Sequence, residues 1–134
     1  MSRGLRNCNP GNIRRSKVRY LGEVVPSQDA DFKQFESMAY GYRAMFVLLD
    51  SYRRRYGLNT IRQMLHRYAP PSENFTDGYI RFVSQRTGIR ADEELDTRSE
   101  RDMIPLVSAM SEIENGVAAS AADVANGWRL FVNK

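Results

Sequence analysis

The stretch Ala69-Pro70-Pro71-Ser72-Glu73-Asn74 interrupts the helical part of the chain. Before it, apolar residues recur every four positions from Ala44 to Tyr56, which is typical of an amphipathic helix beginning after Gly41 and ending at Gly57. Two consecutive prolines cannot continue a helix. The stretch therefore predicts that one helix ends before Pro70 and that another begins after it.

Two helices are expected to flank this break. Thr60 is followed three positions later by Gln63, a pattern typical of a helix start, so the helix that ends at Pro70 should begin there. Asn74 or Thr76 can cap the next helix, and Gly88 should end it.

Two further helices are expected in the last third of the chain. The segment 97–100 could cap the first of these helices. Because Pro105 fits best in the first turn of a helix, we expect this helix to begin near Asp102 instead and to end at 115–116. The final helix should begin near Ser120, with Asp123 three residues later.

The segment before residue 41 lacks a helical period. Turn-forming residues crowd positions 7–12, residues 18–21 read as a short strand, and 24–26 as another extended piece. Phe32 and Phe35 suit either a helical turn or an aromatic anchor. The prediction is a mainly α (α+β) fold: about five helices after a short irregular or β-hairpin head, in a single domain over residues 1–134.

Composition narrows the classes of function. One cysteine and one histidine argue against a disulfide or a zinc site, and no cofactor is expected. The net charge of +4 favours anionic partners such as nucleic acid, membranes or peptidoglycan. No segment has the length and apolarity of a membrane span, and the start lacks an apolar signal region, so synthesis in the cytoplasm is expected.

Carboxylates remain as the chemically useful side chains. His66 should lie within a helix, and Cys8 reads as an inert small residue, although the neighbouring Arg6 can lower a thiol pKa. Glycoside cleavage needs a carboxylic acid whose pKa is raised by burial, and a second carboxylate is not always required. Glu73, in the loop between two helices, is the first candidate and Glu36 the reserve, although either can instead serve a helix N-terminus. The other glutamates are expected to be solvated charges: Glu23, Glu93, Glu94, Glu100, Glu112 and Glu114.

Four spaced segments together resemble a known family. They are Arg3-Gly4-Leu5-Arg6-Asn7-Cys8-Asn9-Pro10-Gly11-Asn12-Ile13-Arg14; Phe32-Lys33-Gln34-Phe35 with Gly41-Tyr42-Arg43-Ala44; Tyr56-Gly57-Leu58-Asn59-Thr60-Ile61; and Ala69 to Thr76 with Tyr79-Ile80. In this order they resemble a family of phage and prophage virion structural proteins. That family is similar to the muralytic lysin of enveloped double-stranded RNA phages, which is lysozyme-like and lytic-transglycosylase-like. The resemblance covers roughly residues 3 to 90.

The resemblance implies a lysozyme-like fold that acts on peptidoglycan glycan strands. It implies delivery to the bacterial wall by a phage virion or lysis system, with other virion proteins as possible partners. Glu73 would be the acid. Residues expected to contact sugar or orient the acid are Asn7, Asn9, Asn12, Tyr40, Arg43, Asn74 and Tyr79.

Two departures from the family's pattern leave alternatives open. Cys8 stands where the family commonly has Asn, and no glutamate precedes the turn at residues 7–12, whereas lysozyme-like enzymes carry their acid on a helix just before the β-hairpin. The leading hypothesis is a peptidoglycan glycosidase or lytic transglycosylase. The alternative is a non-catalytic wall-binding or tail-structural virion module, and a nucleic-acid-binding role, resting on basic charge alone, comes third.

Overall fold

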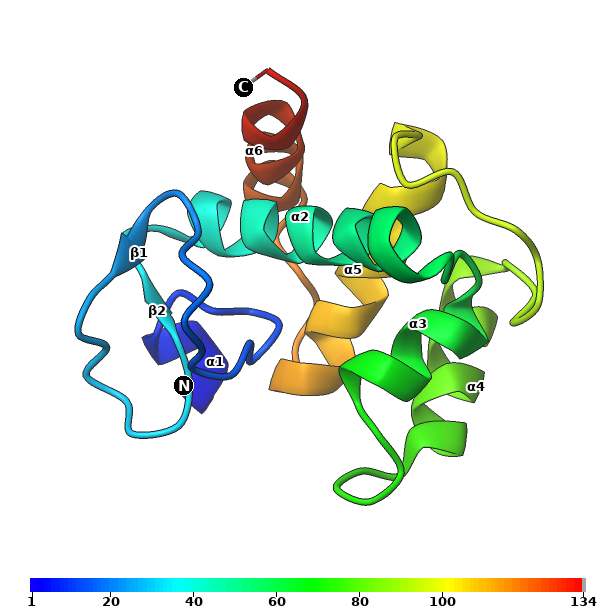
Figure 1. Ribbon diagram of the computed structural model, residues 1–134, viewed down its shortest axis with the longest axis horizontal. Helices are drawn as coiled ribbons and strands as arrows, with labels where there is room; N and C mark the ends of the chain where they lie inside the picture. The colour runs from blue at the N-terminus through cyan, green and yellow to red at the C-terminus, as the bar shows by residue number, and fades with distance from the viewer. Residues whose placement is uncertain (134) are drawn as a thin grey trace.

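The computed structural model describes residues 1–133 and is mainly helical (Figure 1). A two-stranded antiparallel sheet near the N-terminus accompanies the helices, so the expected fold class is confirmed. The elements are α1 (Arg3–Arg6), β1 (Glu23–Val24), β2 (Gln34–Phe35), α2 (Met38–Tyr56), α3 (Ile61–Tyr68), α4 (Thr76–Thr87), α5 (Glu100–Asn115) and α6 (Ala121–Val132).

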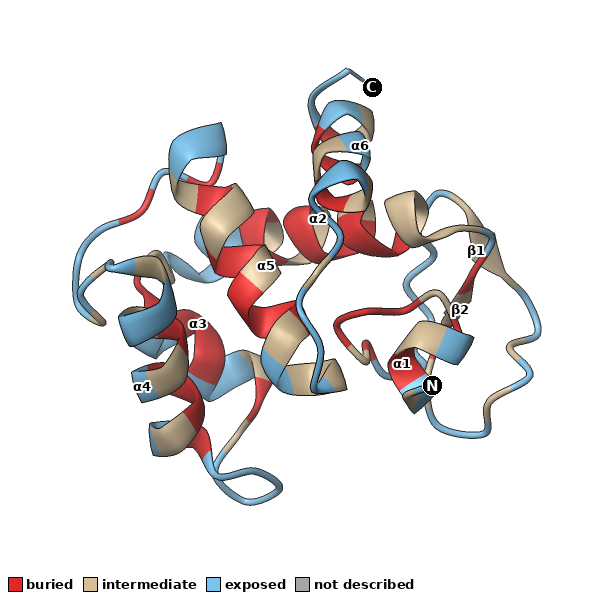
Figure 2. Cartoon of the chain, turned by 180° about the vertical axis from the view of Figure 1, so that it is seen from behind, coloured by how far each residue is buried: buried red, intermediate tan, exposed pale blue. Residues whose placement is uncertain are grey.

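Helix α2 crosses the middle of the molecule, with the N-terminal head at one end and α3 and α4 near the other (Figure 1). Its inward face is buried, as the red positions along it show in Figure 2. Helix α6 packs on α2, where the Phe46 ring lies 5.0 Å from the Trp128 ring in an edge-on arrangement and 6.0 Å from the Phe131 ring. These aromatic contacts anchor one side of the core.

The predicted helix ends are confirmed where glycines and hydroxyl caps carry the signal. Gly57, Gly88 and Gly116 follow α2, α4 and α5 with left-handed φ of 68°, 75° and 73°. Thr60 and Ser120 accept the expected capping hydrogen bonds at the starts of α3 and α6. Local chemistry therefore determines these boundaries.

Helix α2 begins at Met38, capped by Ser37, and not after Gly41 as expected. In two other helices the predicted start or cap is wrong. Helix α5 begins at Glu100, capped by Ser99, so that Pro105 lies inside the helix rather than in its first turn. Helix α4 begins at Thr76 without a side-chain cap, because the Thr76 hydroxyl donates to the Ala69 carbonyl across the loop instead. In the second case a contact outside the helix replaces the local cap.

The head differs from the expected strands. The predicted strand at residues 18–21 is wrong, because β1 pairs with β2 through Glu23 and Phe35, and through Val24 and Gln34. The Val18 carbonyl instead accepts a hydrogen bond of 2.8 Å from the buried Lys33 ammonium, which also pairs with Glu23 at 3.1 Å. Burying a charge is costly unless it has such partners. Because the backbone at residues 16–18 supplies them, it does not pair in a sheet. Phe35 is a buried anchor in a strand, and no helical turn forms there.

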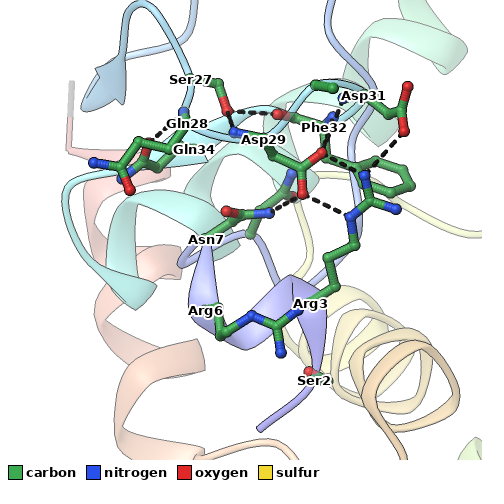
Figure 3. A network of polar contacts seen from close by, with 12 residues as sticks. Ser2, Arg3, Arg6, Asn7, Ser27, Gln28, Asp29, Asp31, Phe32 and Gln34 are labelled. Atoms are coloured by element: carbon green, nitrogen blue, oxygen red, sulfur yellow. Dashed lines mark hydrogen bonds and ion pairs between the residues drawn. The ribbon is translucent and has the colours of Figure 1, made fainter.

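A carboxylate network ties the loop before β2 to α1 (Figure 3). Asp29 accepts hydrogen bonds from the Arg3 guanidinium at 2.6 and 2.7 Å, and from Asn7 at 3.0 Å. It also accepts from the backbone N–H of Asp31. The Arg3 contact, with the backbone donors, holds the pKa of Asp29 well below its usual range. The network fixes the conformation of the head.

Across residues 1–133 no helix combines the length and the apolarity needed to cross a membrane.

Candidate functional site

A cleft of about 320 Å³ opens between the head and the loop that joins α3 to α4. Residues 11–14 form one wall, and residues 69, 70, 73 and 74 contribute to another. Leu48 and Tyr52 come from α2, Arg67 and Tyr68 from α3, and Glu114 from the last turn of α5. The cleft is therefore built from segments far apart in sequence.

Glu114 is the carboxylate most altered by this environment. The Asn12 side-chain amide donates to its Oε1 atom at 2.8 Å, and the Tyr79 hydroxyl donates to its Oε2 atom at 2.9 Å. Burial raises the pKa of Glu114, and the bonds from Asn12 and Tyr79 offset part of that effect. The expectation of a solvated Glu114 is wrong, and so is that of a solvated Glu23, whose side chain is buried beside Lys33.

The turn at residues 9–12, called here the N-terminal turn, places Asn12 against Glu114. The fully buried Asn9 side chain donates to the carbonyls of Ile13 at 3.0 Å and Lys33 at 2.9 Å, and accepts from the Ile13 N–H at 3.0 Å. Asn12 takes a left-handed φ of 50°. Asn115 donates to the Pro10 carbonyl at 2.8 Å, which fastens the turn to the end of α5.

Two tyrosines lie beside Glu114. Tyr79 is buried beneath it, and the Tyr68 hydroxyl donates to the Gly11 carbonyl in the cleft wall. Burial raises the pKa of both hydroxyls well above the ordinary tyrosine value, and the nearby Glu114 charge acts in the same direction. Both hydroxyls therefore hold their protons and act as hydrogen-bond donors.

Glu73 and Asn74 lie on the exposed loop at the mouth of the cleft. The Glu73 side chain is half exposed and lies 3.4 Å from the Arg14 guanidinium. The Asn74 amide donates to the Pro70 carbonyl at 3.3 Å, which helps to shape the loop. The structure thus brings Glu73, Asn74, Asn12 and Glu114 to one cleft, with Tyr79 beneath Glu114.

The other predicted site residues lie elsewhere. Asn7 is bound to Asp29, and Asn9 is fully enclosed within the head. Glu36 is exposed, and neither it nor Tyr40 or Arg43 lines the cleft. Burial lowers the pKa of Arg43 on α2.

The remaining reactive side chains do not form a second centre. His66 is exposed on α3, and burial raises the pKa of the Cys8 thiol, contrary to the lowering that Arg6 suggested. Residues 1–133 hold no cluster of three or more His, Cys, Asp or Glu side chains able to hold a metal ion.

Sequence reasoning missed Glu114. One signal for Glu114 was present: the last turn of α5 contains no basic residue, although cations are favoured at that end of a helix. Glu112 lies in the same turn, however, so this signal does not single out Glu114.

Comparison with known proteins supplies the family. No family model matches the chain. The chain is 36% identical over 118 residues to Protein P5 of Pseudoalteromonas phage PM2, a match that covers 86% of this chain and 72% of the phage protein. The chain therefore belongs to the family of Protein P5 of phage PM2.

Proposed function

We propose that the cleft cleaves the glycan strands of peptidoglycan, with Glu114 as the general acid. The observation that carries this proposal is a partly buried glutamate in an open cleft with its pKa raised by burial. Such a glutamate keeps its proton closer to neutral pH and can protonate the oxygen of a leaving sugar. A lysozyme-type or a lytic-transglycosylase-type reaction would both use it in this way.

The position of Glu114 supports a lysozyme-like arrangement. Lysozyme-like enzymes carry the acid at the end of a helix that leads into the β-hairpin. Here the end of α5 contacts the N-terminal turn through Asn12 and Asn115, and that turn leads toward the sheet. In this proposal the acid comes from a helix that lies later in the sequence, so no glutamate is needed before the turn.

Glu73 suits a different role from the one its sequence position suggested. It is half exposed and lies beside the Arg14 guanidinium, so it lacks the burial that suits a glutamate to act as a general acid. In a hydrolytic reaction Glu73 would activate water or stabilise developing positive charge. In a transglycosylase reaction it would be dispensable.

Digestion of purified sacculi by matched variants tests the proposal. Glu114→Gln should lower muropeptide release by about a hundredfold or more, because general acid catalysis typically contributes that much. Glu36→Gln removes an exposed carboxylate outside the cleft and should leave release unchanged. Full release by Glu114→Gln would exclude Glu114 as the acid. Mass analysis of the products separates hydrolysis from transglycosylation, since only the latter leaves an anhydro-sugar end.

One observation favours a second function. Both oxygens of Glu114 already accept hydrogen bonds from within the protein, so the residue also serves to lock the N-terminal turn onto α5. In a non-catalytic wall-binding or structural phage module this would be its entire role. Binding of the wild-type chain to sacculi without any release of muropeptides would support this function over the first.

The proposed place of action is the bacterial cell wall. Delivery by a phage virion or lysis system accords with a phage relative, and other virion proteins would then be partners.

A further inference from the structure

We infer that Arg67, at the rim of the cleft, binds a carboxylate carried by the glycan substrate. This inference rests on the proposed function, which supplies the identity of the glycan. It predicts which glycan strands bind most tightly in the cleft. Arg67 lines the cleft and also lines the neighbouring surface hollow formed with Leu58, Arg62, Gln63 and His66. Its guanidinium therefore lies where a group attached to a bound glycan would extend from the cleft to the surface.

Two tyrosine rings hold the Arg67 guanidinium in place. Its central carbon lies 3.9 Å from the centre of the Tyr56 ring and 5.5 Å from that of Tyr52. Tyr56 is half exposed at the end of α2, whereas Tyr52 is buried and also lines the cleft. Stacking on a ring face leaves the N–H groups at the guanidinium edge available to a ligand. The head group is therefore oriented before any ligand arrives.

Arg67 carries no ion pair with any residue in the range 1–133, unlike the other cation of the cleft. Arg14 lies against Glu73 at 3.4 Å, so its charge is largely balanced. On the same helix as Arg67, Arg62 is paired with Asp92 at 2.8 Å. Among the described residues, Arg67 is thus the cation of the cleft without a carboxylate partner. A planar guanidinium can bind a carboxylate through two parallel hydrogen bonds.

The glycan strands of peptidoglycan present carboxylates that neutral glycans lack. Intact strands bear them on the stem peptides, and strands stripped of their peptides bear them on the lactyl groups. Chitin, with the same sugar backbone spacing, bears neither. A carboxylate at Arg67 would make the cleft distinguish wall glycan from a neutral polymer.

The test measures binding rather than cleavage, in a Glu114→Gln background so that strands stay intact. Three probes of equal length are titrated: soluble strands with stem peptides, amidase-treated strands with free lactyl groups, and chitin oligosaccharides. Arg67→Gln should weaken binding to charged strands by about three- to tenfold, as expected for one charge-assisted contact at a partly exposed site. Binding to chitin should not change.

Arg101→Gln is the matched control, because Arg101 is exposed near the start of α5 and does not line the cleft. A loss confined to the amidase-treated strands identifies the lactyl carboxylate, and a loss confined to the strands with peptides identifies a stem-peptide carboxylate. A loss on both charged probes shows that Arg67 binds a carboxylate at either position. Unchanged affinity of Arg67→Gln for both charged probes would overturn the inference, as would an equal loss on chitin. Absence of muropeptide release by the wild-type chain would overturn the proposed function. It would not decide the inference about Arg67, which the binding measurements test on their own.

Discussion

Replacing Asn9 by alanine should destabilise the protein without removing any substrate contact. The Asn9 side chain makes three hydrogen bonds within the head, to the Ile13 carbonyl, the Lys33 carbonyl and the Ile13 N–H. Each contributes about 1 kcal/mol net, and the three backbone partners would be left buried without a replacement. The expected loss in the free energy of unfolding is therefore about 3 kcal/mol.

Urea denaturation followed by circular dichroism measures this loss, and Asn74→Ala is the matched control. Asn74 is exposed and makes one long hydrogen bond to Pro70, so its removal should change the unfolding free energy by no more than about 0.5 kcal/mol. A cost below about 1 kcal/mol for Asn9→Ala would refute the reasoning, because it would mean that the N-terminal turn does not depend on that side chain.

Glu114→Gln should make stability less sensitive to pH. Burial raises the pKa of Glu114 in the folded state, so the wild type loses stability as pH rises from the unfolded-state pKa through the folded-state pKa. Melting temperatures across that range should fall in the wild type and not in the variant, and parallel curves would contradict this. Tyr79→Phe removes a hydrogen bond to the ionised carboxylate, so the pKa of Glu114 should rise further. Carboxyl NMR titration measures it, and a lowered value would oppose the assignment. Gly41→Ala would place a Cβ against the Cys8 carbonyl oxygen and should cost about 3 kcal/mol of stability. Gly57→Ala meets no neighbour but has a left-handed φ, so it should cost about 1 kcal/mol. Equal costs in urea denaturation would argue against close packing of α2 on the head.

The helical part of the fold could be predicted because its signals are local. Gly57 and Gly116 end helices through their own backbone freedom, and Thr60 and Ser120 bond to N–H groups three residues away. The predictions were wrong where a distant group competes with a local preference. Thr76 is the clearest example, because its hydroxyl bonds the Ala69 carbonyl instead of capping its own helix.

The candidate acid could not be found by the same means. Nothing beside Glu114 in the sequence indicates burial, because its partners Asn12 and Tyr79 lie 102 and 35 positions away. The loop with Glu73 is marked locally in the sequence by its prolines and by a family pattern, and it forms part of the cleft wall. Its carboxylate, however, remains half exposed. Which glutamate is desolvated depends on the packing of α5 against the head.

The contact between the end of α5 and the N-terminal turn has a consequence for the order of synthesis. Asn12 leaves the ribosome 102 residues ahead of Glu114. A nascent chain ending before α5 would possess most of the cleft wall but not the Glu114 carboxylate. Chemistry that depends on Glu114 would therefore begin only after α5 has folded onto the N-terminal turn.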